Sequence, residues 1–154
     1  MQTFLPYPDF VKSAKSLDRE RLGKQRLECR QILDVVEGRS LAWAAHPAVK
    51  MWMDRPLALA KYAMAICLEW RGRGYSDVQL FWFLDRIADI ERSLHITSPP
   101  TWLGDERLHA SHRAALLAKK PAWYGTFGWK EEPVIRYWWP TKEEPGGKAN
   151  ARRD

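Results

Sequence analysis

Apolar residues recur every three or four positions over the segment Leu17–Gly38, which is the spacing of an amphipathic helix. Ser16 is expected to cap the start of this helix, and Gly38 is expected to end it in a left-handed conformation. One face should therefore pack in a core while the other faces solvent or a ligand. The apolar stripe consists of Leu22, Cys29, Ile32, Leu33 and Val36, and the polar stripe of Arg21, Lys24, Gln25, Glu28 and Gln31.

Three further long helices are predicted from the same spacing. The segment from Pro56 to about Arg73 is apolar on nearly all sides, which is typical of a helix at the centre of a bundle. Ser76 is expected to cap the next helix and Asp105 to cap the last one, while Pro47 suits the first turn of a short helix. The buried stripe expected for the helix after Ser76 consists of Leu80, Phe83, Leu84, Ile87 and Leu94.

The helical pattern stops after Pro121. The next twenty residues are rich in aromatic side chains and glycine without a clear period, so we predict an extended segment that wraps the bundle. Residues 141–154 are polar and contain glycine, and we expect them to be disordered. No repeat or strong strand pattern occurs. The sequence therefore predicts an all-α fold, a compact helical bundle formed by a single domain over residues 1–140.

Composition supports one hydrophobic core and an anionic partner. The chain has 154 residues, 45% of them hydrophobic, which suffices for one packed domain. Its net charge is +6, and its nine tryptophans could stack on bases as well as fill a core. No signal peptide or long apolar run is present, so we expect a cytoplasmic protein, nucleoid-associated if bacterial, with no membrane contact.

No metal or organic cofactor is expected. Cys29 and Cys67 fall in separate predicted helices, without a second cysteine at ligand spacing, and are interpreted as buried thiols in a reducing compartment. His109 and His112 are one helical turn apart, but zinc would need two further ligands, and helix capping or phosphate contact is the other interpretation. The sequence also lacks a phosphate-binding glycine loop, a G-x-S-x-G elbow and a dinucleotide fingerprint.

The order of several short segments resembles the pyrimidine-dimer DNA glycosylases, the family founded on the phage enzyme endonuclease V. Each segment is weakly specific, and their shared order carries the resemblance. The segments are the N-terminal arm MQTFLPYPDF; Leu17, Asp18 and Leu22 leading to Glu28; Pro47; EWRGRGY at 69–75; GDERLHAS at 104–111; and KPAWYGTFG at 120–128.

The resemblance implies a catalytic pair formed by the N-terminal α-amine and a helix glutamate. The founding enzyme exposes its second residue after methionine removal, whereas Gln2 is bulky and should leave Met1 in place. The matching residues are therefore Met1 and Glu28, although Leu27 stands where the family has an arginine and the spacing from the arm is longer. An α-amine has an ordinary pKa of about 8, which leaves a nucleophilic neutral fraction near pH 7. Lys24 is the competing nucleophile.

Double-stranded DNA, damaged and distorted, is the partner that the resemblance implies, and we expect a monomer. Arg26 and Arg30 could instead form structural ion pairs, and His109 could cap a helix. Four aromatic residues could line the DNA-binding groove or pack against the bundle instead: Trp123, Tyr124, Phe127 and Trp129. The candidate DNA contacts are Gln2, Arg21, Lys24, Gln25, Arg26, Arg30, Gln31, His109, His112, Arg113, Lys120, Trp123 and Tyr124.

The function implied is that of a DNA repair glycosylase with abasic-site lyase activity. It would excise a damaged pyrimidine, with the cyclobutane pyrimidine dimer as the expected lesion, through an imine on the N-terminal amine. Two alternatives stay open. The same groups could act on another modified pyrimidine or an abasic site, or the protein could be a non-catalytic nucleic-acid-binding module in which Glu28 only pairs with Lys24.

Overall fold

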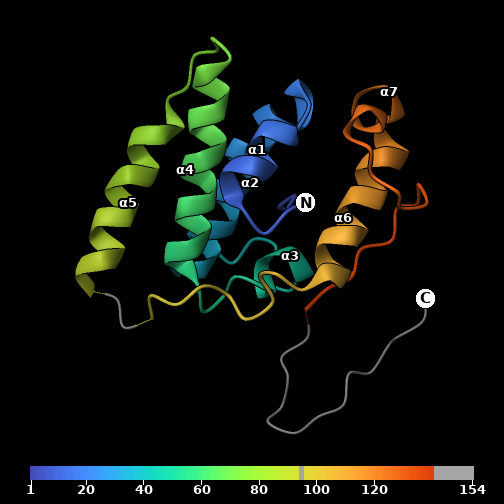
Figure 1. Ribbon diagram of the computed structural model, residues 1–154. Helices are drawn as coiled ribbons and strands as arrows, with labels where there is room; N and C mark the ends of the chain where they lie inside the picture. Colours follow the sequence, from blue (N-terminus) through green and yellow to red (C-terminus); the bar gives the residue numbers. More distant parts are fainter. Residues whose placement is uncertain (94–95, 141–154) are drawn as a thin grey trace, which may run out of the picture.

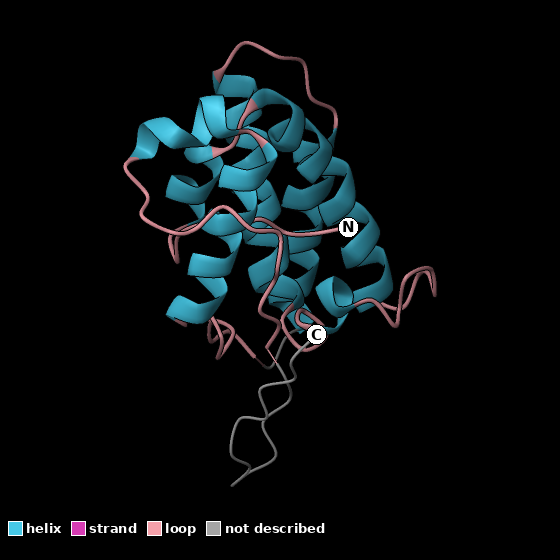
Figure 2. Cartoon of the chain, turned by 90° about the vertical axis from the view of Figure 1, so that its right-hand side faces the viewer, coloured by secondary structure: helices cyan, strands magenta, loops and turns pink. Residues whose placement is uncertain are grey.

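Helix α4 (Pro56–Gly72) lies at the centre of the bundle in the computed structural model, which describes residues 1–93 and 96–140 (Figure 1). It packs against α1 (Phe10–Ser16), α2 (Arg19–Val36) and α5 (Gln79–Ser93), as its apolar sequence predicted. No strand occurs in the described part of the chain, so the predicted all-α class is confirmed (Figure 2). The remaining elements are α3 (Pro47–Lys50), α6 (Glu106–Lys119), α7 (Pro121–Tyr124) and the 3-10 turn η1 (Gly125–Phe127).

Several predicted helix ends are confirmed. Pro47 and Pro56 occupy the first turns of α3 and α4, where a missing N–H costs nothing. Asp105 caps α6 by accepting a 3.0 Å hydrogen bond from the Arg107 N–H. Gly38 follows α2 with a φ of 79°, the left-handed conformation expected there. Local sequence signals therefore fix these boundaries.

Two predicted caps are wrong. Ser16 is the last residue of α1, a seven-residue helix too short for its period to stand out, and α2 starts after Asp18. At the start of α5, the Asp77 carboxylate rather than Ser76 accepts the Leu80 N–H, at 2.7 Å. In both places an aspartate one or two residues after the predicted serine lies at the start of the helix instead.

The buried stripe of α5 is narrower than predicted. Leu80 and Phe83 are buried, but Leu84 is 39% exposed, and Ile90, which was not predicted, is buried instead. Leu94 lies outside the described residues. Because α5 stands at the edge of the bundle and packs mainly against α4, only one side of it is covered (Figure 1).

The segment after Pro121 is only partly extended. Residues 121–127 form α7 and η1, so the prediction is wrong there; Pro121 starts a short helix as its fixed φ allows. Residues 128–140 have no helix or strand and follow α6, as predicted for a wrapping segment. Val134 donates its N–H to the Ala114 carbonyl at 3.3 Å, and Trp138 donates to the Ser111 hydroxyl at 3.0 Å. The predicted disordered tail, 141–154, lies outside the described residues.

Helices α2 and α4 approach closely at Gly23. A Cβ built there would lie 2.9 Å from Cζ3 of Trp70, which is closer than van der Waals contact permits. The Trp70 ring cannot easily move, because its Nε1 donates to the Ser76 carbonyl at 2.9 Å and its face meets Tyr75. Gly23 therefore allows the two helices to pack.

The environment of the two cysteines agrees with the prediction of buried thiols. Cys29 and Cys67 are both buried and free, and burial raises the pKa of each thiol. Over residues 1–93 and 96–140, no helix combines the length and the apolar character needed to cross a membrane.

Candidate active site

Residues 2–6 of the N-terminal arm pass through the interior of the protein instead of lying on its surface. Gln2, Thr3, Phe4 and Leu5 are all buried, although they belong to no helix or strand. A buried extended segment leaves backbone N–H and C=O groups that must find partners elsewhere. Side chains of α2, α4 and α6 supply most of these partners, so the path of the arm is set by tertiary contacts.

Gln25 on α2 is the main anchor of the arm. Its Oε1 accepts the Phe4 N–H at 2.8 Å, and its Nε2 donates to the Gln2 carbonyl at 2.6 Å. The Tyr62 hydroxyl of α4 donates to the Phe4 carbonyl at 2.6 Å, and Trp52 donates to the Thr3 hydroxyl at 3.0 Å. Gln25 was predicted to contact DNA, but its side chain is buried and its amide is committed to the arm.

His109 and His112 on α6 bind the two backbone polar groups of Leu5, its C=O and its N–H. His112 Nδ1 accepts the Leu5 N–H at 2.9 Å, while His109 Nδ1 lies 2.8 Å from the Leu5 carbonyl. His109 Nε2 accepts the Gly104 N–H at 3.0 Å, which assigns its proton to Nδ1 as the donor to Leu5. Both rings are buried, so the structure gives them a positioning role where DNA contact was predicted.

Neither histidine is positioned with further metal ligands. No group of three or more histidine, cysteine, aspartate or glutamate side chains that could hold a metal occurs within residues 1–93 and 96–140. Three of the four ring nitrogens of His109 and His112 already bond to backbone atoms of Leu5 and Gly104. The hydrogen bonds to Leu5 in the arm therefore account for the spacing of His109 and His112.

Burial of the His112 ring predicts acid sensitivity of the fold. Burial lowers the pKa of His112 from 6.5 to about 3, and burial also lowers the pKa of His109. The unfolded chain takes up a proton on this ring near pH 6.5, whereas the folded protein does so only near pH 3. The folded state is therefore fully stable with respect to this ring above about pH 6.5 and loses stability as the pH falls toward 3. We expect the free energy of unfolding of the wild type, measured with urea, to fall by roughly 3 kcal/mol between pH 6.5 and 4 from this ring alone.

The matched variant for this prediction is His112→Asn. Its amide oxygen can still accept the Leu5 N–H but takes up no proton, so stability should decline less steeply with acid, although stability at pH 7 is lower. An equally steep decline in wild type and variant would contradict the assignment of the acid response to His112.

The buried arm brings the first two residues of the chain to Glu28. The Gln2 N–H donates to Glu28 Oε2 at 3.5 Å, and Gln25 Nε2 lies 3.4 Å from the same oxygen. Met1 is half-buried beside them and packs against the core. The Glu28 side chain is only 12% exposed. Met1 and Glu28, which the resemblance paired, thus lie at one place in the structure.

The Lys24–Glu28 pairing of the alternative interpretation is also present. Lys24 Nζ lies 3.6 Å from Glu28 Oε1, one helical turn away. The lysine side chain is 74% exposed, and an exposed ion pair of this kind contributes at most about 1 kcal/mol. This contact therefore does not account for a glutamate that is largely buried against the arm.

His46 is a further residue whose charge the N-terminal amine and Glu28 affect, and it was not among the predicted site residues. It caps α3, its Nδ1 accepting the Ala48 N–H at 3.0 Å. Burial lowers the pKa of His46, the positive charge of the N-terminal amine lowers it further, and Glu28 acts in the opposite direction. The amine and Glu28 therefore both lie within electrostatic reach of the ring. The only sequence signal was the histidine before Pro47, which indicates a helix cap as readily as a site.

The arginines on the other flank of α2 form structural contacts. Arg26 pairs with Asp77 at 2.5 Å and lies over the Trp70 ring. Arg30 donates to the Gln79 side chain at 3.0 Å and lies over the Trp82 ring. These contacts join α2 to the start of α5, as the structural alternative for both arginines proposed.

The predicted contacts on α6 and α7 also hold parts of the protein together. Arg113 donates to the Pro6 carbonyl at 2.8 Å and to Glu131 at 2.7 Å, and it pairs with Glu106. Trp123 donates to the Ser16 carbonyl at 2.8 Å. Phe127 and Trp129 stack beside Tyr124, which supports packing over groove lining for these rings.

Tyr124 binds the buried carboxylate at the start of α2. Its hydroxyl accepts the Asp18 N–H at 3.0 Å and donates to the Asp18 carboxylate. Burial alone would raise the pKa of Asp18, but hydrogen bonds from Tyr124 and Arg21 outweigh it and leave the pKa below its ordinary value. Arg21 and Lys120 pair with this carboxylate at 3.2 and 3.7 Å and remain partly exposed. With the exposed Lys24, Gln31 and Trp123, they are the predicted contacts still open to a ligand.

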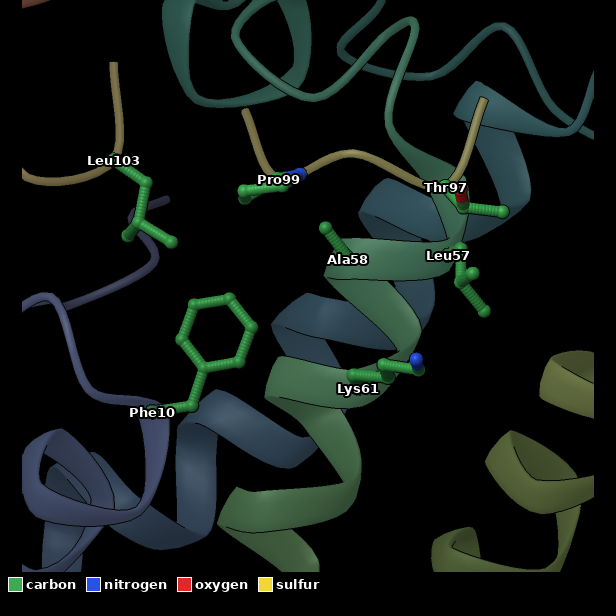
Figure 3. A pocket seen from close by; sticks show the side chains of 7 residues that line it. All are labelled: Phe10, Leu57, Ala58, Lys61, Thr97, Pro99 and Leu103. Carbon is green, nitrogen blue, oxygen red and sulfur yellow. The ribbon is translucent and has the colours of Figure 1, made fainter. Parts of the chain in front are cut away.

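A separate apolar hollow lies between α1, α4 and the chain before α6 (Figure 3). Its volume is about 140 Å³, and Lys61 is its one charged lining residue. Its other lining residues include Phe10 at the start of α1 and Leu103 before α6. None of the predicted site residues lines it, so this hollow is not part of the site.

Comparison with known proteins identifies the family. The sequence model of the pyrimidine dimer DNA glycosylases matches residues 1–82, a range that includes the arm, α2 and the whole of α4. The segments 104–111 and 120–128, which also carry the resemblance, lie beyond that range. No curated protein and no solved structure matches the chain. Because the match covers more than half of the 154 residues, the chain belongs to the pyrimidine dimer DNA glycosylase family.

Proposed function

We propose that this protein excises pyrimidine dimers from duplex DNA and cleaves the resulting abasic site, with the amine of Met1 as nucleophile and Glu28 as its partner. The contact of the Gln2 N–H with Glu28 Oε2, at 3.5 Å, supports this most directly. This hydrogen bond joins the first peptide of the chain to the glutamate. Membership of a DNA glycosylase family supports DNA as the substrate class.

The reaction needs only groups that this site contains. The neutral amine attacks C1′ of the damaged nucleotide, the glycosidic bond breaks, and the base leaves with the bonding electrons and a proton. The C1′–O4′ bond of the sugar ring then breaks, O4′ takes the second amine proton to become a hydroxyl, and an imine forms between the Met1 nitrogen and C1′. Removal of a proton from C2′ then breaks the C3′–O bond by β-elimination. Glu28 would stabilise the positive charge on the sugar and carry the protons.

Four polar side chains around the arm are the proposed contacts to the DNA backbone. Lys24 and Gln31 are exposed on α2, and Arg21 and Lys120 are partly exposed beside Asp18. Lysine and arginine bind phosphates without sequence preference, which suits an enzyme that selects a lesion by its distortion of the duplex. We propose that the protein acts as a monomer on damaged double-stranded DNA.

Borohydride trapping tests this proposal directly. The protein is incubated with a duplex containing one cyclobutane thymine dimer, beside undamaged and abasic duplexes, and any reduced adduct is located by peptide mass mapping. We expect an adduct on the Met1 nitrogen with the dimer and abasic duplexes and none with undamaged DNA. Trapping with abasic DNA alone would mean that the protein is an abasic-site lyase and not a dimer glycosylase. The absence of an adduct with every duplex would favour a non-catalytic DNA-binding module.

A further inference from the structure

Trp43 has an unusual backbone conformation and an unusual exposure. It is the only non-glycine residue with positive φ in residues 1–93 and 96–140, at 64°. Its side chain is 61% exposed in the loop between α2 and α3. A bulky residue is strained in the left-handed region of backbone conformations, and glycine or asparagine would relieve this strain. The fold therefore holds a large flat ring in solvent at a position where folding favours a smaller residue.

The loop that carries Trp43 leads into α3, beside the N-terminal arm. The Trp43 ring meets His46 edge-on, with centroids 6.2 Å apart, and His46 meets Trp139 edge-on at 6.0 Å. His46 caps the start of α3, and Trp52, which follows α3, donates to the Thr3 hydroxyl of the arm at 3.0 Å. Trp43 is thus the exposed end of a row of rings next to the short helix that flanks the arm.

We propose that Trp43 stacks on a nucleobase displaced from the duplex next to the attacked nucleotide. This inference rests on the proposed function. An amine that reaches C1′ in a duplex requires a distorted or extruded nucleotide, and the bases around it lose their stacking partners. An exposed indole offers a new stacking face and carries no sequence preference, because every base has a π-face. A strained loop that presents the ring in advance reduces the ordering cost of binding.

Substitution of Trp43 separates stacking from folding. Trp43→Gly removes the ring and relieves the positive φ, so its melting temperature should equal or exceed that of the wild type. We expect this variant to bind a duplex containing one abasic site at least about fivefold more weakly than the wild type. Trp43→Phe should retain most of the affinity, whereas Trp43→Leu, which is apolar without a flat ring, should resemble Trp43→Gly. Phe81→Ala, which truncates an exposed ring on α5, is the matched control and should change nothing.

The outcomes distinguish this inference from the proposed function. Equal affinity of wild type and Trp43→Gly, with dimer-dependent trapping intact, would overturn the role of Trp43 alone. A fivefold loss that phenylalanine restores, in a protein that traps no dimer duplex, would support stacking and overturn dimer excision. Trp43→Leu with wild-type affinity would also overturn the inference, because it would assign the effect to apolar contact.

Discussion

Glu28→Gln is expected to lower turnover on dimer-containing DNA about a hundredfold or more while changing the affinity for that DNA little. Glutamine keeps an oxygen that can accept the Gln2 N–H, now 3.5 Å from Glu28 Oε2, so the arm should stay in place. It cannot take up a proton or carry the negative charge that the sugar cation requires. The measurement is single-turnover excision with binding measured in parallel.

Lys24→Ala is the control for this variant. It removes the exposed partner of Glu28, whose Nζ lies 3.6 Å from Oε1, but leaves the buried contacts of the glutamate with the arm. We expect turnover within a few fold of the wild type at saturating DNA. Undiminished turnover by Glu28→Gln would remove the glutamate from the reaction and favour its interpretation as a simple ion-pair partner of Lys24.

Blocking the Met1 amine is expected to abolish borohydride trapping and strand cleavage while leaving much of the DNA binding intact. Acetylation turns the amine into an amide, which has no nucleophilic lone pair. A single added residue moves the free amine away from Glu28, because residues 2 to 5 are fixed by hydrogen bonds to α2, α4 and α6. Trapping yield and cleavage of a dimer duplex are the measurements.

Lys24 provides the control for the blocked protein, as it is the competing nucleophile. Lys24→Ala with a free N-terminus should trap as the wild type does, although it binds DNA somewhat more weakly. If the blocked protein still formed an adduct, and that adduct mapped to Lys24, the reaction would be assigned to the lysine. Full cleavage without any adduct would point to water as the attacking group.

The apolar and polar pattern predicted the four long helices α2, α4, α5 and α6. The period of α2, the apolar surface of α4, the first-turn prolines Pro47 and Pro56 and the Asp105 cap are local properties, expressed within a few residues of where they act. For the same reason the all-α class was predictable. The resemblance also singled out Met1 and Glu28, and the structure adds the contact of the neighbouring Gln2 N–H with Glu28.

The environment of each polar side chain was decided only by tertiary structure. Gln25, His109 and His112 share the sequence signature of surface residues on amphipathic helices, yet the arm crosses beside them and takes their hydrogen bonds. Arg26 was predicted to contact a phosphate, but its guanidinium binds Asp77, which lies fifty-one positions away in the sequence. A buried backbone without a sheet must find partners at long sequence separation, and periodicity carries no information about them.

Two further features could not be predicted from the sequence pattern for the same reason: the close approach of α2 to α4 and the surroundings of the N-terminal amine. Gly23 is an ordinary helical glycine in sequence, and only the position of Trp70 explains why no larger residue fits. The Trp43 ring meets His46, a contact within the loop before α3 that the sequence pattern does not predict. The sequence by itself determined the long helices and which groups could react. The fold decided which of them meet, because side-chain contacts depend on how the helices pack around the buried arm.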